Sequence, residues 1–233
     1  MSWSSRDSGF TTVTLCGMTS ALTDRTFAAV LFDNDGTLID STEAVRRSWG
    51  RWAIEHDVDP FSLTGFHGVP AAAIVAAVLP DGDQESALAR IVAIEESDTA
   101  GVVALPGAAE ALTALGPHAA IATSATHDLA RARLEAAGLG IPDVMVSADD
   151  ITHGKPDPEP FLLAAQRMGV DPAHCLVIED APSGLTSGRA AGCATLAVVS
   201  THQEHELSAD LIVPDLSHVE FVTETEGVRF RLL

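Results

Sequence analysis

The chain has 233 residues, 46% of them hydrophobic, which is enough for one large domain or for a core with a small inserted domain. Its net charge of −20 argues against nucleic acid and anionic membranes as partners, and no apolar run approaches the roughly 18 residues of a membrane span. Cys175 and Cys193 lie in apolar, strand-like segments and are expected to be buried thiols, which suits a reducing compartment. We therefore predict a cytoplasmic protein and expect a monomer.

The N-terminal part is predicted to contain a leader, one strand and a helical insertion. Residues 1–22 are expected to be disordered, and the apolar run 27–32 is typical of a buried strand. Residues 42–104 contain no convincing strand. Their helical patterns lie at 43–56, 71–79 and 85–97. We interpret this stretch as a small α-helical cap domain, inserted where it can close over a site and exclude water.

Strands and helices alternate through the remainder of the chain. Further strands are predicted at 119–123, 144–146, 176–179, 195–199 and 211–213. Helical patterns lie at 128–137, 161–168 and 183–191, and a β-hairpin is predicted from 220–223 and 228–231. The first of these helices is expected to carry Leu129, Ala132 and Ala136 on one face. The alternation predicts an α/β fold, with a doubly wound, Rossmann-like parallel sheet formed by residues 23–41 and 105–233.

Two acidic residues follow the first strand directly. Asp33 and Asp35 leave its C-terminal end, and Gly36 comes next, where it is expected to permit a bend that a side chain would obstruct. Ligands of parallel α/β sheets bind at this end of the strands. Clustered carboxylates repel each other unless a cation lies between them. The pattern indicates an Mg²⁺ site with an aspartate free to act as nucleophile; a calcium loop or an ordinary turn is the alternative.

Lys155 is the only lysine of the chain, since all other Lys and Arg positions are arginines. A lysine provides a compact point charge for a phosphate oxygen or a carboxylate, and a surface lysine without function is the alternative. Polar residues also follow two other predicted strands, at Thr123-Ser124 and at Glu179-Asp180. Together with the Asp33 loop, these positions could supply the nucleophile, the hydrogen-bond donors, the cation and the metal ligands of a phosphoryl-transfer site.

In this order, four segments resemble those of the haloacid dehalogenase (HAD) superfamily of aspartyl-phosphate phosphatases. They look most like the branch that contains 2-deoxyglucose-6-phosphate and glycerol-phosphate phosphatases and β-phosphoglucomutase. The matching segments are LFDNDGTLIDS (31–41), ATSAT (122–126), GKPDPEPF (154–161) and IEDAPSG (178–184). Each segment is weak alone, but all four in the correct order are specific.

The resemblance implies an Mg²⁺-dependent phosphatase that hydrolyses small sugar or polyol phosphate monoesters through an aspartyl phosphate. Asp33 would be the nucleophile and Asp35 the general acid and base, while Thr123 would hold phosphoryl oxygens and Lys155 would bridge Asp33 and the phosphate. The implied Mg²⁺ ligands are Asp33, Asp180, the backbone carbonyl of Asp35 and Glu179. The residues implied to face the substrate are Asn34, Ser124, His67 and Gly68.

Departures from the family pattern narrow this prediction. The predicted cap has no lysine for a Schiff base, and Asp35 is retained, unlike in the dehalogenases. Val45 aligns with a histidine of β-phosphoglucomutase, and no arginine follows Gly68-Val69. A hexose-phosphate mutase is therefore the disfavoured alternative, and a non-catalytic phosphate-binding module is another. Asn34 either faces the substrate or turns the loop.

Overall fold

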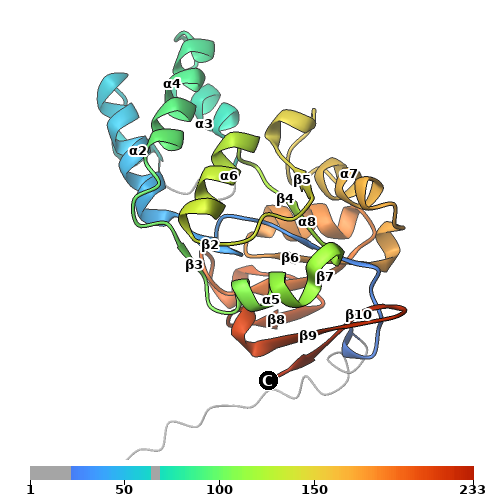
Figure 1. Cartoon of the computed structure of the whole chain (residues 1–233). Helices are drawn as coiled ribbons and strands as arrows, with labels where there is room; N and C mark the ends of the chain where they lie inside the picture. The colour runs from blue at the N-terminus through green and yellow to red at the C-terminus, as the bar shows by residue number, and fades with distance from the viewer. Residues whose placement is uncertain (1–21, 64–68) are drawn as a thin grey trace, which may run out of the picture.

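A computed structural model describes residues 22–63 and 69–233 of the protein. Its central sheet has six strands, all parallel to their neighbours, in the order β5-β4-β1-β6-β7-β8 (Figure 1). The strands are β1 (Ala29–Phe32), β4 (Ala119–Ala122), β5 (Val144–Val146), β6 (Cys175–Glu179), β7 (Ala194–Val198) and β8 (Leu211–Val213). The sheet confirms the predicted α/β class and each predicted core strand.

Helices cover both faces of this sheet. They are α5 (Ala108–Leu115), α6 (His127–Ala136), α7 (Glu159–Met168) and α8 (Pro182–Ala190). Side chains alternate along β1: Val30 and Phe32 pack in one apolar cluster with α5 and α6, and Leu31 packs in another with Phe161 of α7. Because both faces are buried, the strand reads as a continuous apolar run in the sequence. Of these helices, only α5 had no counterpart among the predicted elements.

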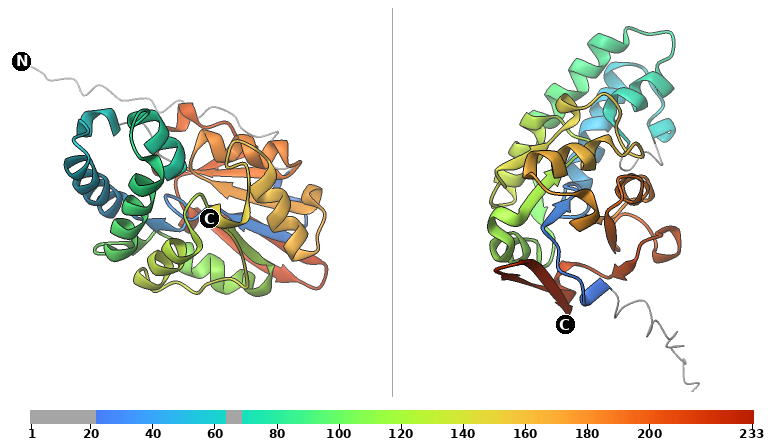
Figure 2. Two further views of the ribbon diagram at one scale, coloured as in Figure 1. Left: turned by 90° about the horizontal axis from the view of Figure 1, so that it is seen from above. Right: turned by 90° about the vertical axis from the view of Figure 1, so that its right-hand side faces the viewer.

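Three helices form a lobe beside the sheet, which is the predicted α-helical cap (Figure 2). They are α2 (Thr42–Glu55), α3 (Ala71–Val78) and α4 (Gln84–Ser97), with a 3₁₀ turn at Pro60–Leu63. They enclose an apolar cluster of their own around Trp52 and Ile91. The Trp52 indole also donates a hydrogen bond to the carbonyl of Ala87 at 2.8 Å, which joins α2 to α4.

Two short strands connect the cap to the core. β2 (Ile39–Asp40) and β3 (Val103–Ala104) pair antiparallel, with Ile39 opposite Ala104. The expectation that residues 42–104 contain no strand is therefore wrong at its C-terminal end. A two-residue strand has no detectable periodicity of its own, and this one exists because β2 provides a partner. The limits assigned to core and cap stay predictions.

The C-terminal hairpin is confirmed as β9 (Val219–Glu224) and β10 (Gly227–Leu232). Phe221 and Phe230 pack against the cluster that contains Phe32. Cys175 and Cys193 are free and buried, as predicted. No helix in the described part of the chain is long and apolar enough to cross a bilayer.

The expected leader lies outside the described residues except at its last position. Leu22 is 4% exposed and belongs to the same apolar cluster as Phe27. Its side chain packs against the core, so the expectation of disorder is wrong for this residue.

Candidate active site

Asp33 and Lys155 form a buried ion pair at the carboxyl end of the sheet. Asp33 follows β1, and Lys155 lies in the loop before α7. The ammonium of Lys155 donates to Asp33 Oδ1 at 2.5 Å and to Glu179 Oε1 at 2.8 Å. The Lys155 side chain is 3% exposed. The only lysine of the chain is thus enclosed between two carboxylates, which excludes the alternative of a surface lysine.

Burial and charge act together on these groups. Burial opposes the charged form of Lys155, but the charges of Asp33 and Glu179 outweigh it and raise the pKa of the ammonium above its ordinary value. Burial raises the pKa of Asp33 well above its ordinary value, against the attraction of Lys155. Burial, followed by the charge of Glu179, raises the pKa of Asp180 to about 7. The site therefore contains more negative charge than Lys155 balances.

Asp180 is held from the opposite side by hydroxyl groups. Thr37 Oγ1 lies 3.4 Å from Asp180 Oδ1, Ser200 Oγ lies 3.3 Å from Asp180 Oδ2, and Thr201 also donates to Oδ2. Gly36 has a φ of +90°, and a Cβ there would lie 2.2 Å from Asp180 Oδ2. The bend expected at Gly36 is present. It brings the loop that follows β1 (residues 33–38, called the catalytic loop below) close to this carboxylate.

Three carboxylates in this site could hold a metal ion. Oxygen atoms of Asp33, Glu179 and Asp180 all lie within 4.8 Å of one another, and all three residues are buried. With Lys155 the ionised cluster carries a formal charge of −2, which one divalent cation neutralises. Carboxylate oxygens are the ligands that Mg²⁺ prefers, so the donor set fits this ion.

Asp35 points toward a different set of partners. Its Oδ1 accepts from Ser41 Oγ at 2.6 Å and from Arg133 at 2.8 Å, and Asn34 Nδ2 lies 3.3 Å from its Oδ2. Arg133 belongs to α6 of the core, and it also contacts Glu95 of the cap. The carboxylate of Asp35 is therefore held by donors from the catalytic loop, from the N-cap of α2 and from α6.

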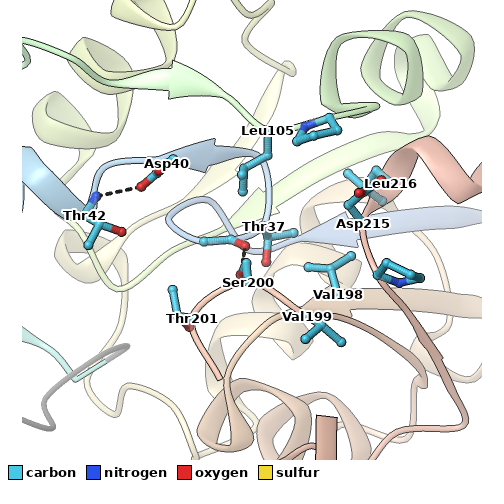
Figure 3. Close-up of a pocket in the computed structure, with 13 residues that line it drawn as sticks. Thr37, Asp40, Thr42, Leu105, Val198, Val199, Ser200, Thr201, Asp215 and Leu216 are labelled. Carbon is cyan, nitrogen blue, oxygen red and sulfur yellow. Dashed lines mark hydrogen bonds between the residues drawn. The ribbon is translucent and has the colours of Figure 1, made fainter. Parts of the chain in front are cut away.

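The cavity drawn in Figure 3 is lined on one side by Gly36 and Thr37 of the catalytic loop. It has a volume of about 420 Å³. Thr37, Ser200 and Thr201 line it, and all three contact Asp180. Asp40 and Leu105, from the two connections to the cap, line it as well. The cavity thus lies between the cap connections and the side chains that orient Asp180.

Comparison with known proteins identifies the family. Residues 27–192 match the family model of haloacid dehalogenase-like hydrolases. The chain belongs to this family. It is 39% identical to hexitol phosphatase A of Escherichia coli (strain K12) over 84% of the chain and 95% of that protein. It is 33% identical to validoxylamine A 7'-phosphate phosphatase of Streptomyces hygroscopicus subsp. limoneus, over 84% and 97%.

A solved structure supports the same conclusion. The crystal structure of a hydrolase from Pseudomonas syringae superimposes with a TM-score of 0.73 at 27% identity, and covers 83% of the chain and 95% of that structure. The resemblance to the HAD superfamily is confirmed, and the chain is an enzyme, a hydrolase of this family.

Most of the residues predicted for the HAD site lie at the expected end of the sheet. Thr123 follows β4, is 2% exposed and accepts from the amide of Ala125 at 3.1 Å. Ser124 beside it is partly buried. His67 and Gly68 lie outside the described residues, so the predicted substrate contacts of the cap stay predictions. The roles assigned to individual residues stay predictions too.

Asn34 is buried within the catalytic loop. Its backbone carbonyl accepts from the amides of Leu38 and Ile39, at 2.9 and 3.1 Å. Its side-chain oxygen is buried and has no hydrogen-bond partner among the described residues. These contacts favour the interpretation that Asn34 turns the loop.

Arg133 is a site residue that the sequence analysis missed. Of the residues expected on one face of α6, Leu129 is buried, Ala132 is partly buried and Ala136 is exposed, so the buried face of the helix lies elsewhere than these three residues indicate. Arg133 is buried on this helix along with Leu129, Ala130 and Leu134. Its spacing of four from Leu129 was the available signal, since residues i and i+4 share a helix face.

Glu179 has a role beyond the predicted metal contact. Its Oε1 accepts from Lys155, and its Oε2 accepts from the amides of Asp180 and Ala181 at 2.8 Å each. A Cβ at Gly184 would lie 1.7 Å from Oε1, so the glycine of the matching segment leaves room for this side chain. Glu179 therefore orients Lys155 and fixes the turn into α8.

Proposed function

We propose that the protein is an Mg²⁺-dependent phosphatase of small sugar or polyol phosphate monoesters, and that it acts through an aspartyl phosphate on Asp33. The observation that carries this proposal is the buried contact of Asp33 with Lys155, beside Asp180, at the carboxyl end of the sheet. A nucleophilic carboxylate needs nearby positive charge to receive an anionic phosphate, and a strongly acidic protein must supply that charge locally.

The first step transfers the phosphoryl group to the enzyme. An oxygen of Asp33 attacks phosphorus, the bond between phosphorus and the substrate oxygen breaks, and Asp35 gives its proton to that leaving oxygen. Lys155 contacts Asp33 and a phosphoryl oxygen, and Thr123 and Ser124 bind the remaining oxygens. The ammonium holds its proton throughout, because its pKa is raised by the neighbouring carboxylates against the effect of burial.

The second step releases phosphate. Water attacks the phosphorus of the aspartyl phosphate, Asp35 takes a proton from that water, and the bond to Asp33 breaks. Asp33, Asp180 and the backbone carbonyl of Asp35 would hold Mg²⁺, with Glu179 in the same cluster. The bound ion supplies positive charge that offsets the charge of the phosphoryl group.

The substrate class is proposed from the relatives and from the cap. The similar proteins named above are a hexitol phosphatase and a validoxylamine A 7'-phosphate phosphatase, and a hexitol is a polyol. A helical cap beside the catalytic end of the sheet can enclose a small substrate and exclude water. His67 and Gly68 are the proposed cap contacts. The monomeric state and the cytoplasmic location stay predictions.

A screen of phosphate esters for released phosphate, with and without Mg²⁺, tests the reaction. Asp33→Asn is nearly isosteric and should abolish turnover while it retains the thermal unfolding transition, because the amide is not a nucleophile. Mass spectrometry of acid-quenched wild-type enzyme with substrate should place a phosphoryl group on Asp33. Turnover by Asp33→Asn at the wild-type rate would exclude covalent catalysis by this residue.

A further inference from the structure

Arg133 joins the catalytic loop to the cap through two ion pairs, of which the one with Glu95 is buried on both sides and the one with Asp35 is partly exposed. Its two terminal nitrogens donate to different carboxylates. One donates to Asp35 Oδ1 at 2.8 Å, and the other donates to Glu95 Oε1 at 3.0 Å. The side chains of Arg133 and Glu95 are only 5% and 7% exposed. The three residues come from α6, from the cap helix α4 and from the loop after β1. A single guanidinium therefore connects three segments that are far apart in the sequence.

Glu95 is anchored within the cap. Burial raises its pKa, and the charge of Arg133 opposes that effect. The neighbouring Trp49 side chain also lowers the pKa of Glu95. Trp49 and the neighbouring Ile94 belong to the apolar cluster of the cap. The position of the Glu95 carboxylate thus follows the position of the cap helices.

The geometry points to Arg133 as a positioning residue. Through its contact with Glu95, Arg133 links the orientation of the Asp35 carboxylate to the position of the cap against the core. This inference rests on the proposed function, in which Asp35 transfers protons. A guanidinium is a rigid planar fork, so the contact with Glu95 fixes where the nitrogen that meets Asp35 lies. The third nitrogen, Nε, is buried without a hydrogen-bond partner in the described part of the chain, so the two carboxylates alone fix the group by hydrogen bonds.

A purely structural brace between cap and core is the competing explanation. The two explanations differ in how the effect of a substitution depends on the leaving group. An alkoxide needs a proton as it leaves, whereas nitrophenolate is a weak base and leaves without one. Loss of the correct orientation of Asp35 should therefore slow an alkyl phosphate more than p-nitrophenyl phosphate. A lost brace should slow both substrates equally.

The test compares Arg133→Met with Arg131→Met, a control on the same helix. Arg131 forms an exposed pair with Glu135 at 2.9 Å. Values of kcat/KM are measured for sorbitol 6-phosphate and for p-nitrophenyl phosphate, because they report the steps up to phosphorylation of Asp33. We expect Arg133→Met to lower the first value about 10²-fold and the second less than about tenfold, as for a misplaced general acid. Arg131→Met should change neither value. Equal losses on both substrates would overturn the inference.

Glu95→Gln is the second variant. It is expected to fold, because glutamine has nearly the same volume as glutamate. It should lower the ratio of kcat/KM for sorbitol 6-phosphate to kcat/KM for p-nitrophenyl phosphate, as Arg133→Met does. An unchanged ratio would overturn the link to the cap. The double variant should lose no more selectivity than Arg133→Met alone, because both changes break the same link. A wild-type protein that hydrolyses neither ester would instead refute the proposed function, so the two failures are distinguishable.

Discussion

Ion pairs in the core and in the cap join a basic and an acidic side chain in opposite surroundings. The Lys155–Asp33 pair has side chains that are 3% and 10% exposed, whereas the Arg46–Glu43 pair of the cap has side chains that are 70% and 63% exposed. Exposed pairs contribute roughly 0–1 kcal/mol to stability, but removal of one partner from a buried pair leaves an uncompensated charge. An ion pair on the cap surface therefore adds little to stability, whereas the buried pair of the core cannot lose one partner without a large cost.

Lys155→Met should have the largest effect on activity and on stability, far larger than the matched substitution in the exposed pair of the cap. We expect a loss of kcat of about 10²–10³-fold, as for removal of one group that stabilises transition-state charge. We also expect a loss of about 3–5 kcal/mol in the free energy of unfolding at pH 8, because Asp33 and Glu179 would be left buried without their partner. Chemical denaturation and steady-state kinetics measure the two losses. Arg46→Met is the matched control, and an equal effect of both substitutions would remove the distinction between the regions.

Mg²⁺ should stabilise the protein more at pH 8 than at pH 5.5. In the ion-free protein the pKa of Asp180 is raised to about 7 by burial and by Glu179, so its contribution to stability is present at low pH and is lost as the pH rises through 7. A bound cation needs the ionised carboxylate, so it replaces the proton most effectively at high pH. At 100 times its Kd, a ligand adds about 2.7 kcal/mol.

Thermal unfolding with EDTA and with Mg²⁺, at both pH values, measures this difference. Asp180→Asn should abolish the shift in Tm. Equal shifts at pH 5.5 and pH 8 in the wild-type protein would contradict the assignment of the metal site to these carboxylates.

The smallest effect is expected at Glu55 on the cap surface. Hydrogen bonds from Arg90 and Arg51 lower its pKa to about 2, so this contribution to stability is present above pH 4.5 and is lost as the pH falls toward 2. Glu55→Gln should lower Tm slightly at pH 7, should change Tm less at pH 2, and should leave kcat/KM unchanged. A large loss of activity at pH 7 would show that surface pairs of the cap take part in catalysis.

The sequence was most informative where short-range patterns and sheet topology agree. Asp33, Thr123 and Asp180 each follow a strand, and the order β4-β1-β6 places these strand ends side by side. Parallel strands direct their carboxyl ends to one edge, so the convergence could be predicted without side-chain detail.

Contacts that depend on tertiary packing could not be predicted in this way. Arg133 reaches Asp35 across 98 positions of sequence, and an arginine on a helix is most often solvated. The strand β3 exists only through its pairing with β2. The contacts of Glu179 with Lys155 and with the turn into α8 depend on the close approach at Gly184, which no local pattern encodes.

The paired strands β2 and β3 make the cap and the catalytic loop mechanically continuous. Ile39 of β2 forms a bridge with Asp35 and also donates its amide to Asn34, while it pairs with Ala104 on the returning strand. The outgoing and returning segments of backbone are paired, so any movement of the cap would be transmitted to the turn that carries Asp35. Substitutions in this ribbon should consequently alter the timing of bond cleavage as well as the entry of substrate.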